Sequence, residues 1–321
     1  DIVAFNFPEG DTVFLDEQNR SYYQIVREQA LALMQNDIIR GEPAHKPFAY
    51  YLTKAREYLL RTRPWAVRPT DKKEHYVKRC VALPADTLLI YRGVVYVNGK
   101  REHLSPQHQF YFYVRCRGFL PVDYFVEKYD VARSEIFQVA GTSPPTYLMG
   151  ISLRSYLKIL KDPNIDSVWL NLQEPSGNTD MRTFPNHPQF NWNENFFGPL
   201  VVPAKGMTIP LNSSTIKLYG RIIRDYEHNT LTIVDKNKYL INGKETNTYT
   251  FKMNYYFMVG DNRHNSLDSR FWGFVPEDHI MGKPVLVVLS FNKDEFLLHI
   301  KSNPLRILND IRRDRLLKIP R

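Results

Sequence analysis

The sequence predicts a mainly β protein with α-containing insertions, α+β overall. Two stretches, 75–100 and 199–291, contain alternating or continuous apolar runs that are bounded by turn residues, as β-strands are. Two other stretches, 22–39 and 48–61, space their apolar residues as helices do. We therefore expect a β-sheet or β-barrel core that is assembled from separate parts of the chain, with helices in the insertions.

These patterns divide the chain into a core and three additions. The core opens with the apolar run at the N-terminus and resumes at His75, where an Asn-Gly pair predicts a hairpin turn. The predicted parts are the β-rich core (1–15, 70–100 and 199–300), a helical insertion (16–69), an inserted subdomain (101–198) and a basic C-terminal helix (301–321).

The inserted subdomain has weaker signals than the core. Helices are expected at Glu127–Gln138 and Ile151–Lys161, and the Asn- and Pro-rich segment Asp162–Asn195 is expected to be loop. Two core segments resemble each other, Thr87–Lys100 and Thr230–Lys244, because each contains a strand, a short turn, a strand and Asn-Gly. We expect them to form two similar hairpins in one sheet.

Length and composition indicate a large protein that is not itself membrane-spanning. At 321 residues the chain exceeds the usual single domain. Its longest apolar stretches, such as Pro284–Leu289, are far shorter than the roughly 20 residues of a membrane-spanning helix, and we expect no signal peptide. Cys80 and Cys116 cannot form a disulfide framework and lack zinc-site spacing, so we expect no metal and no cofactor.

Positive charge gathers at the C-terminal end. The net charge is +9, and Lys301–Arg321 holds seven Lys or Arg against two Asp. Such an end can contact nucleic acid or an anionic membrane surface, or can be a solvated helix face. No recognition helix, aromatic RNA platform or zinc module accompanies it, so we expect no nucleic-acid partner. The expected amphipathic helix, Leu305–Ile319, would lie near a membrane surface.

A dense polar turn between two apolar runs, within Tyr256–Phe291, is the most informative feature of the chain. Polar groups in such a place serve either chemistry or one specific turn. Asp268 and Arg270 are expected to pair and hold the turn, whereas His264 is expected to have no role. The polar residues of the turn are Asp261, Asn262, Arg263, Ser266, Asp268, Ser269 and Arg270.

Lys78 lies in a predicted strand, where a lysine taken alone is usually an exposed edge residue. Strand alternation puts Lys78 on the same face as Tyr76, which can shield the amine from water. A free lysine has a pKa of about 10.4 and is almost wholly protonated at neutral pH, so it cannot accept a proton from a serine. Burial against apolar neighbours lowers that pKa and makes the amine a usable base.

Taken together, these residues resemble the bacterial type I signal peptidases (leader peptidases), which are serine–lysine proteases. Tyr256–Phe291 resembles the last motif of that family, and Tyr76–Arg79 followed by Leu83–Asp86 resembles its lysine-bearing region. Asp1–Pro8 resembles the strand that follows the nucleophile of the family. Ala85 departs from the pattern, since the family has glycine there, and a left-handed backbone at this alanine would cost about 1 kcal/mol.

The resemblance implies an enzyme that cleaves signal peptides from exported preproteins on the extracytoplasmic side of the bacterial cytoplasmic membrane. Lys78 would be the general base and Ser266 would orient its amine. Asp261, Asn262, Arg263, Asp268 and Arg270 would support the site. His75, Tyr76 and Val77 would form one wall of a groove that binds the substrate as an added β-strand.

The nucleophile of the family is an upstream serine in a Ser-Met motif, which a membrane helix precedes. We expect this serine to be absent from the chain, because it would lie before Asp1, and we expect the chain alone to be inactive. Ser21 has the context of a helix cap, and Ser143 and Ser176 come after the lysine, so none of the three is a good candidate. The alternative is a non-catalytic homologue that retains the fold as a binding or scaffolding module.

Overall fold

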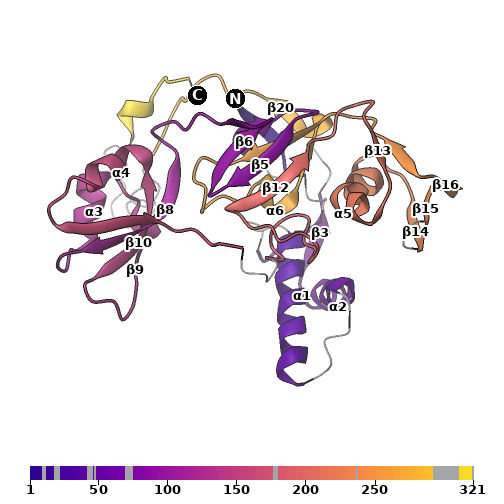
Figure 1. Cartoon of the computed structure of the whole chain (residues 1–321), viewed down its shortest axis with the longest axis horizontal. Helices are drawn as coiled ribbons and strands as arrows, with labels where there is room; N and C mark the ends of the chain where they lie inside the picture. The colour runs from indigo at the N-terminus through magenta and orange to yellow at the C-terminus, as the bar shows by residue number, and fades with distance from the viewer. Residues whose placement is uncertain are drawn as a thin grey trace.

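The computed structural model describes residues 1–8, 12–17, 22–41, 46, 48–68, 75–175, 180–235, 238–291 and 311–319. Within them, a β-rich core lies between a smaller sheet with two helices, an α1–α2 helix pair and a lobe around α5 (Figure 1). The predicted fold class, mainly β and α+β overall, is confirmed. The domain boundaries stay a prediction.

The core is built on a five-stranded antiparallel sheet in the order β19-β18-β4-β1-β20. The central strand β4 pairs with β1 from Arg79 to His75, whereas its pairing with β18 covers only the other end, from Ala82 to Arg79. The end of β4 that carries Lys78 therefore has β1 on one side only. The strands are β1 (Ile2–Asn6), β4 (His75–Ala82), β18 (Tyr255–Val259), β19 (Val275–Pro276) and β20 (Ile280–Gly282).

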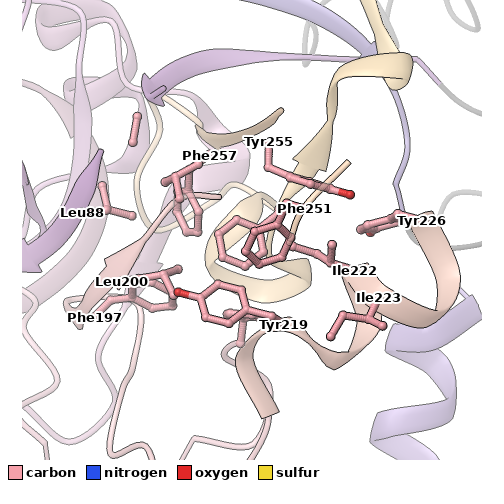
Figure 2. Close-up of a cluster of buried hydrophobic side chains, with 14 of the residues drawn as sticks. Leu88, Phe197, Leu200, Tyr219, Ile222, Ile223, Tyr226, Phe251, Tyr255 and Phe257 are labelled. Carbon is pink, nitrogen blue, oxygen red and sulfur yellow. The ribbon is translucent and has the colours of Figure 1, made fainter. Parts of the chain in front are cut away.

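A second sheet and an aromatic cluster complete the core. The sheet has the order β12-β5-β6-β7, and its inward side chains, such as Leu88 and Phe197, pack against Phe257 of β18 (Figure 2). Tyr219 and Phe251 extend the same buried cluster into the α5 lobe. The strands of this sheet are β5 (Thr87–Tyr91), β6 (Val94–Val97), β7 (Lys100–Arg101) and β12 (Phe196–Val201).

The lobe around α5 contains two small sheets, β13-β17 and β14-β15-β16. The echo between 87–100 and 230–244 is real in local structure, because Asn98 and Asn242 both adopt a left-handed turn that glycine follows. The two hairpins lie in different sheets, however, so the prediction of one sheet was wrong. The elements are β13 (Thr208–Pro210), α5 (Ser213–Arg221), a π-helical turn (Ile222–Tyr226), β14 (Leu231–Asp235), β15 (Lys238–Ile241), β16 (Lys244–Glu245) and β17 (Thr248–Thr250).

Residues 109–170 form a sheet with its own apolar core. The sheet order is β11-β8-β10-β9, and alternate residues of β8, from Phe110 to Cys116, are buried with side chains of α3 and α4. The elements are β8 (Gln109–Cys116), α3 (Val122–Tyr129), a 3-10 turn (Arg133–Glu135), β9 (Ile136–Gln138), β10 (Thr146–Ser152), α4 (Leu153–Ile159) and β11 (Ile165–Leu170).

Three predictions inside this subdomain need correction. The expected helix 127–138 is shifted towards the N-terminus, because Asp130 adopts φ 53° and ends α3 there. The expected helix 151–161 begins only after β10, where the Ser152 side chain accepts from the Ser155 N–H as a cap. The segment 162–195 was expected to be loop, but it contains β11, which pairs with β8.

The helices predicted over 22–39 and 48–61 are present as α1 (Tyr22–Ile39) and α2 (Phe48–Thr62). They pack on each other through buried side chains that include Ile25, Val26 and Leu59. Two short strands, β2 (Thr12–Phe14) and β3 (Trp65–Val67), pair at the base of the helix pair. Ser21 lies outside the described residues, so its capping role stays a prediction.

The expected helix Leu305–Ile319 is wrong over its described part. Residues 311–319 contain a bridge from Ile311 to Phe291 and a 3-10 turn at Arg313–Arg315. The N–H of Leu317 donates to the carbonyl of Val287, and the N–H of Arg312 donates to the carbonyl of Ser290, so this segment pairs with 287–291 through backbone hydrogen bonds. Residues 292–310, like Ser176, lie outside the described part of the chain. Among the helices that the structure describes, none has the length and apolar character of a membrane-spanning helix.

Candidate active site

Lys78 lies on β4 at the point where the pairing with β18 ends. Its side chain shares a face with Tyr76, as strand alternation predicts, and Nζ lies 5.8 Å from the centre of the Tyr76 ring. Tyr76 itself packs against Phe7 and Trp272. The aromatic wall therefore covers one side of the amine, which is the environment that the base needs.

The amine of Lys78 donates to the hydroxyl of Ser266, with 3.0 Å between Nζ and Oγ. Burial lowers the pKa of Lys78, and the charge of Arg270 adds to the lowering, whereas the carboxylates of Asp268 and Asp261 act in the opposite direction. Burial prevails because the ammonium loses hydration that these carboxylates do not replace. The lysine is thus closer to a neutral amine than a lysine in water.

Asp268 and Arg270 form the predicted pair, and both are almost completely buried. Arg270 Nε and Nη2 each donate to one carboxylate oxygen of Asp268 at 2.8 Å. Burial raises the pKa of Asp268, but the arginine, the N–H of Gly260 and the Ser266 hydroxyl together lower it below the usual value. The carboxylate therefore stays ionised inside the site.

The hydrogen bonds of Ser266 define what its hydroxyl can do. A serine has one proton to donate and two lone pairs that accept. Its contact with Lys78 uses a lone pair, because the amine donates to Oγ. Ser266 therefore accepts from Lys78 and orients one N–H of the amine, which leaves the lone pair of a neutral Lys78 free for another proton.

Gly260 makes the contact between Lys78 and Ser266 sterically possible. A Cβ at this position would lie 2.1 Å from Ser266 Oγ and 3.5 Å from Lys78 Nζ. Any side chain here would push the serine away from the amine. The motif contains this glycine, but the sequence alone did not indicate what it must accommodate.

The remaining charged residues of the motif fasten the turn to the core strands. Asp261 accepts from Arg79 of β4 at 2.8 Å through both of its oxygens. Arg263, which is buried, donates to both oxygens of Glu102 at 2.7 Å. The turn is thus held by Arg79 of β4 and by Glu102, which follows β7. Glu102 was not among the predicted site residues.

The inserted subdomain also reaches the turn. Gln109, at the start of β8, accepts from the N–H of Arg263 and donates to the carbonyl of Asp261, both at 2.9 Å. Glu135 Oε1 accepts from the side-chain amides of Asn262 at 2.8 Å and Asn265 at 2.7 Å. Sequence reasoning missed Gln109 and Glu135, because nothing local connects them to a motif that lies more than a hundred residues away.

His264 has a structural role that the sequence did not suggest. Its Nδ1 accepts from the N–H of Tyr111 at 2.9 Å, so the proton is on Nε2, which faces Asn195 Oδ1 at 2.8 Å. Burial, together with the charges of Arg270 and Arg263, lowers the pKa of His264 to about 4. The neutral imidazole thus joins the turn to β8, and the expectation of no role was wrong.

The predicted substrate wall is accessible. Val77 is 56% exposed, and the His75 ring contacts Asn6 Oδ1 at 2.9 Å. A cavity of about 200 Å³ lies beside this end of β4. It is lined by Ile2, Val77, Lys78, Arg79, Gly260, Asp261, Asn262, Asn265 and Ser266. The lining brings Lys78 and Ser266 together with part of the predicted groove, Val77.

Two other features bear on the chemistry. Within the described ranges, no three His, Cys, Asp or Glu side chains group so as to hold a metal ion. Cys80 and Cys116 are both free thiols, and burial raises the pKa of each to about 11. Neither thiol is poised to react as a thiolate.

Comparison with known proteins finds matches that are all signal peptidases. The family model for signal peptidase, peptidase S26, matches residues 201–289, which include the turn that carries Ser266. Signal peptidase I of Buchnera aphidicola subsp. Acyrthosiphon pisum is 38% identical over 89 residues, which is 26% of this chain and 28% of that protein. Signal peptidase I of Aquifex aeolicus is 49% identical over 57 residues, 18% of this chain and 22% of that protein.

A longer match is found with signal peptidase I of Pseudomonas aeruginosa, which is 25% identical over 207 residues, 54% of this chain and 72% of that protein. The first two relatives are matched over about a quarter of their own length. The matches agree in one family, and the structure brings the motif turn and Lys78 into one site. The chain is similar to bacterial type I signal peptidases over these residues.

Proposed function

We propose that this protein carries the general base of a serine–lysine endopeptidase that cleaves signal peptides from exported preproteins. The observation that supports this most directly is the 3.0 Å contact between Lys78 Nζ and Ser266 Oγ. Burial lowers the pKa of the amine, so Lys78 has the property that a base for a serine needs. The signal peptidases to which the chain is similar supply the proposed substrate class.

The nucleophile in this proposal is a serine upstream of Asp1 in the intact protein, and the 321 residues alone are inactive. Ser266 orients the base in this proposal, because its oxygen accepts the hydrogen bond that Lys78 donates. An orienting residue of this kind fixes the rotamer of the base without adding a charge next to it.

The reaction follows from these positions. The neutral amine of Lys78 removes the hydroxyl proton of the nucleophile as its oxygen attacks the scissile carbonyl carbon. The ammonium then gives that proton to the leaving amine, the C–N bond breaks and an ester joins the enzyme to the signal peptide. Lys78 next deprotonates a water molecule that attacks the ester, which releases the carboxylate and restores the serine.

The substrate is proposed to bind as an extra strand along His75–Val77. The pairing of β18 with β4 ends at Arg79, so this end of β4 has β1 on one side and the Lys78 cavity next to it. A strand in this position gains backbone hydrogen bonds while alternate side chains enter pockets. The scissile bond then comes to lie at Lys78.

The membrane is the second proposed partner, on the extracytoplasmic side of the bacterial cytoplasmic membrane. In the described part of the C-terminal segment, Arg312, Arg313, Arg315 and Lys318 lie close to the exposed apolar side chains of Val285 and Val288. Cationic and apolar groups on one surface suit an anionic lipid interface.

The test is cleavage of a preprotein by the intact protein that the gene encodes. Lys78→Ala is expected to lower kcat by about three or more orders of magnitude, as loss of a base from a nucleophile–base pair does. Lys100→Ala, an exposed lysine on β7, is the control and should retain activity. Retained activity in Lys78→Ala would mean that the base is misassigned. An upstream gene segment without a serine motif would favour the non-catalytic alternative.

A further inference from the structure

A second cavity, of about 310 Å³, lies on the other side of Ser266. It shares Asn265 and Ser266 with the cavity around Lys78, so Ser266 lines both cavities. Its walls combine the helical insertion, the loop before β12 and the motif turn. The lining residues are Gln24, Arg27, Glu28, Arg182, Glu194, His264, Asn265, Ser266, Leu267 and Phe271.

Helix α1 is a fixed wall of this cavity. One face of the helix, with Ile25 and Val26, is buried in the helix pair. Gln24, Arg27 and Glu28 of the same helix line the cavity. Arg221 of α5 ties the helix to the core, because its guanidinium lies 5.5 Å from the centre of the Tyr23 ring and donates to the carbonyl of Trp272 at 3.0 Å. Trp272 follows Phe271, which lines the cavity, so α1 is anchored close to the cavity.

Glu194 is the charge in this cavity that lacks a direct partner. The two arginines whose charges act on Glu194 are each engaged by an aspartate: Arg182 donates to Asp180 at 3.0 and 3.1 Å, and Arg270 donates to Asp268. No described residue donates a hydrogen bond to the Glu194 carboxylate. Burial raises the pKa of Glu194 against the attraction of both arginines, so the carboxylate is incompletely solvated. A donor that entered the cavity would supply the missing partner.

We propose that this cavity is a substrate subsite that accepts a basic side chain from the residues that follow the scissile bond. This inference rests on the proposed function. Residues before the scissile bond lie along His75–Val77 and reach Lys78, so the chain that continues past Ser266 enters the second cavity. An ammonium or guanidinium there donates to Glu194 and forms a charge-assisted hydrogen bond. The helical insertion, which lines this cavity, thereby contributes to the selection of substrates by the first residues of the mature protein.

The test uses the intact enzyme and a series of peptides that are identical up to the scissile bond. The second residue after the bond is lysine, norleucine or glutamate, because norleucine keeps most of the lysine side chain and lacks its charge. We expect kcat/KM to be about tenfold higher for the lysine peptide than for the norleucine peptide, and lowest for the glutamate peptide, as for a partly buried ion pair. The ratio should fall at high salt.

Glu194→Gln should bring the lysine-to-norleucine ratio to about one, because the amide keeps the size of the side chain and loses its charge. Glu174→Gln is the matched control, since it removes an exposed carboxylate from the same segment outside the cavity, and it should keep the preference. Equal kcat/KM values for the three peptides with the unmodified enzyme overturn the inference, and so does a preference that survives in Glu194→Gln.

Failure of the proposed function has a different signature, because then none of the peptides is cleaved. In that case the affinities of the same peptides for the 321-residue chain, measured by fluorescence anisotropy, decide the inference. Tighter binding of the lysine peptide than of the norleucine peptide supports the subsite, and equal binding overturns it. The peptide series needs no variant, so a Glu194→Gln protein that does not fold leaves the test intact.

Discussion

Lys78 Nζ and Ser266 Oγ lie 3.0 Å apart, although 188 positions separate the two residues in the sequence. The contact joins a strand from the first third of the chain to a turn near its end. It depends on three things: burial that lowers the pKa of the amine, an Asp268 carboxylate that stays ionised on the same turn, and a glycine that leaves room. Each of them leads to a separate prediction.

The first prediction is that Lys78→Met stabilises the fold at neutral pH. Burial lowers the pKa of Lys78, so the unfolded chain binds more protons than the folded chain between the folded and the ordinary lysine pKa. The stability of the unmodified protein therefore rises with pH through that window. Lys78→Met has no amine to charge at this position, so its stability lacks this dependence on pH. The free energy of unfolding, measured by denaturant titration, should differ most at neutral pH and converge as the pH rises towards the ordinary lysine pKa.

Lys205→Met is the control for this effect, because Lys205 is exposed and lies at a turn of the core. Its stability difference from the unmodified protein should not change over the same pH range. A constant difference for Lys78→Met would contradict the claim that burial holds the pKa of this amine down.

The second prediction concerns the buried pair of Asp268 and Arg270. Asp268→Asn leaves a buried guanidinium without its counter-charge, which costs about 3–5 kcal/mol, far more than loss of a surface pair. Glu57→Gln breaks the exposed pair with Lys54 and should cost less than about 1 kcal/mol. Chemical denaturation of both variants gives the comparison, and similar costs would show that the motif pair behaves as a surface pair.

The third prediction tests whether the inserted subdomain positions the turn. Glu135→Ala removes the acceptor of the amides of Asn262 and Asn265, so the turn that carries Ser266 loses its contact with the 3-10 turn Arg133–Glu135. In the intact enzyme we expect kcat to fall by about tenfold while KM changes little, since a misoriented base affects the chemical step. Glu127→Ala on α3, an exposed position, is the control.

Rescue by Glu135→Gln separates positioning from charge, because the glutamine carbonyl still accepts from one of the two amides. Partial recovery of kcat is expected for the glutamine variant. A fall in melting temperature without any change in kcat would instead assign Glu135 a purely structural role.

The fourth prediction uses Ala85, which replaces the glycine of the family and adopts φ 70°. The left-handed conformation costs a residue with a Cβ about 1 kcal/mol, so Ala85→Gly should stabilise the protein by up to that amount. Ala204→Gly, at an alanine without positive φ, should destabilise it instead, because glycine only adds entropy to the unfolded chain there. Opposite signs in thermal melts are the expected result, and two losses of stability would contradict the strain at Ala85.

The sequence located the chemistry better than the fold. Lys78 and Ser266 each lie in a motif that can be recognised from its neighbouring residues alone. Strand alternation was sufficient to predict that Tyr76 lies beside the amine. Glu135 was not predictable, since a carboxylate at a 3-10 turn becomes part of the site only through a contact with Asn262 across 127 residues. Tertiary contacts of this length leave no periodic trace in the sequence.

Errors in the secondary structure have equally local causes. The strand β11 is short and lies in a segment rich in Asn and Pro, so composition outweighed the alternation of its apolar residues. Asp130 ends α3 because it adopts a left-handed conformation. This conformation is rare for aspartate, so the sequence pattern did not predict the end of the helix. The segment 311–319 has helical spacing but pairs with residues 287–291, and such pairing is decided by tertiary structure.

The last prediction concerns Gly260, whose missing side chain is what allows the base and Ser266 to meet. A Cβ there would lie 2.1 Å from Ser266 Oγ and 2.6 Å from its Cβ, so Gly260→Ala forces the serine away from Lys78. In the intact enzyme, kcat should fall by about a hundredfold or more, since the amine loses its orientation. Gly206→Ala is a poor control because its φ is positive, whereas Gly118→Ala, which meets open space, should leave kcat unchanged. Ser266→Gly in combination with Gly260→Ala removes both close contacts, so the double variant should be no less active than Ser266→Gly alone, and a further loss would show that Gly260 acts through something other than the serine.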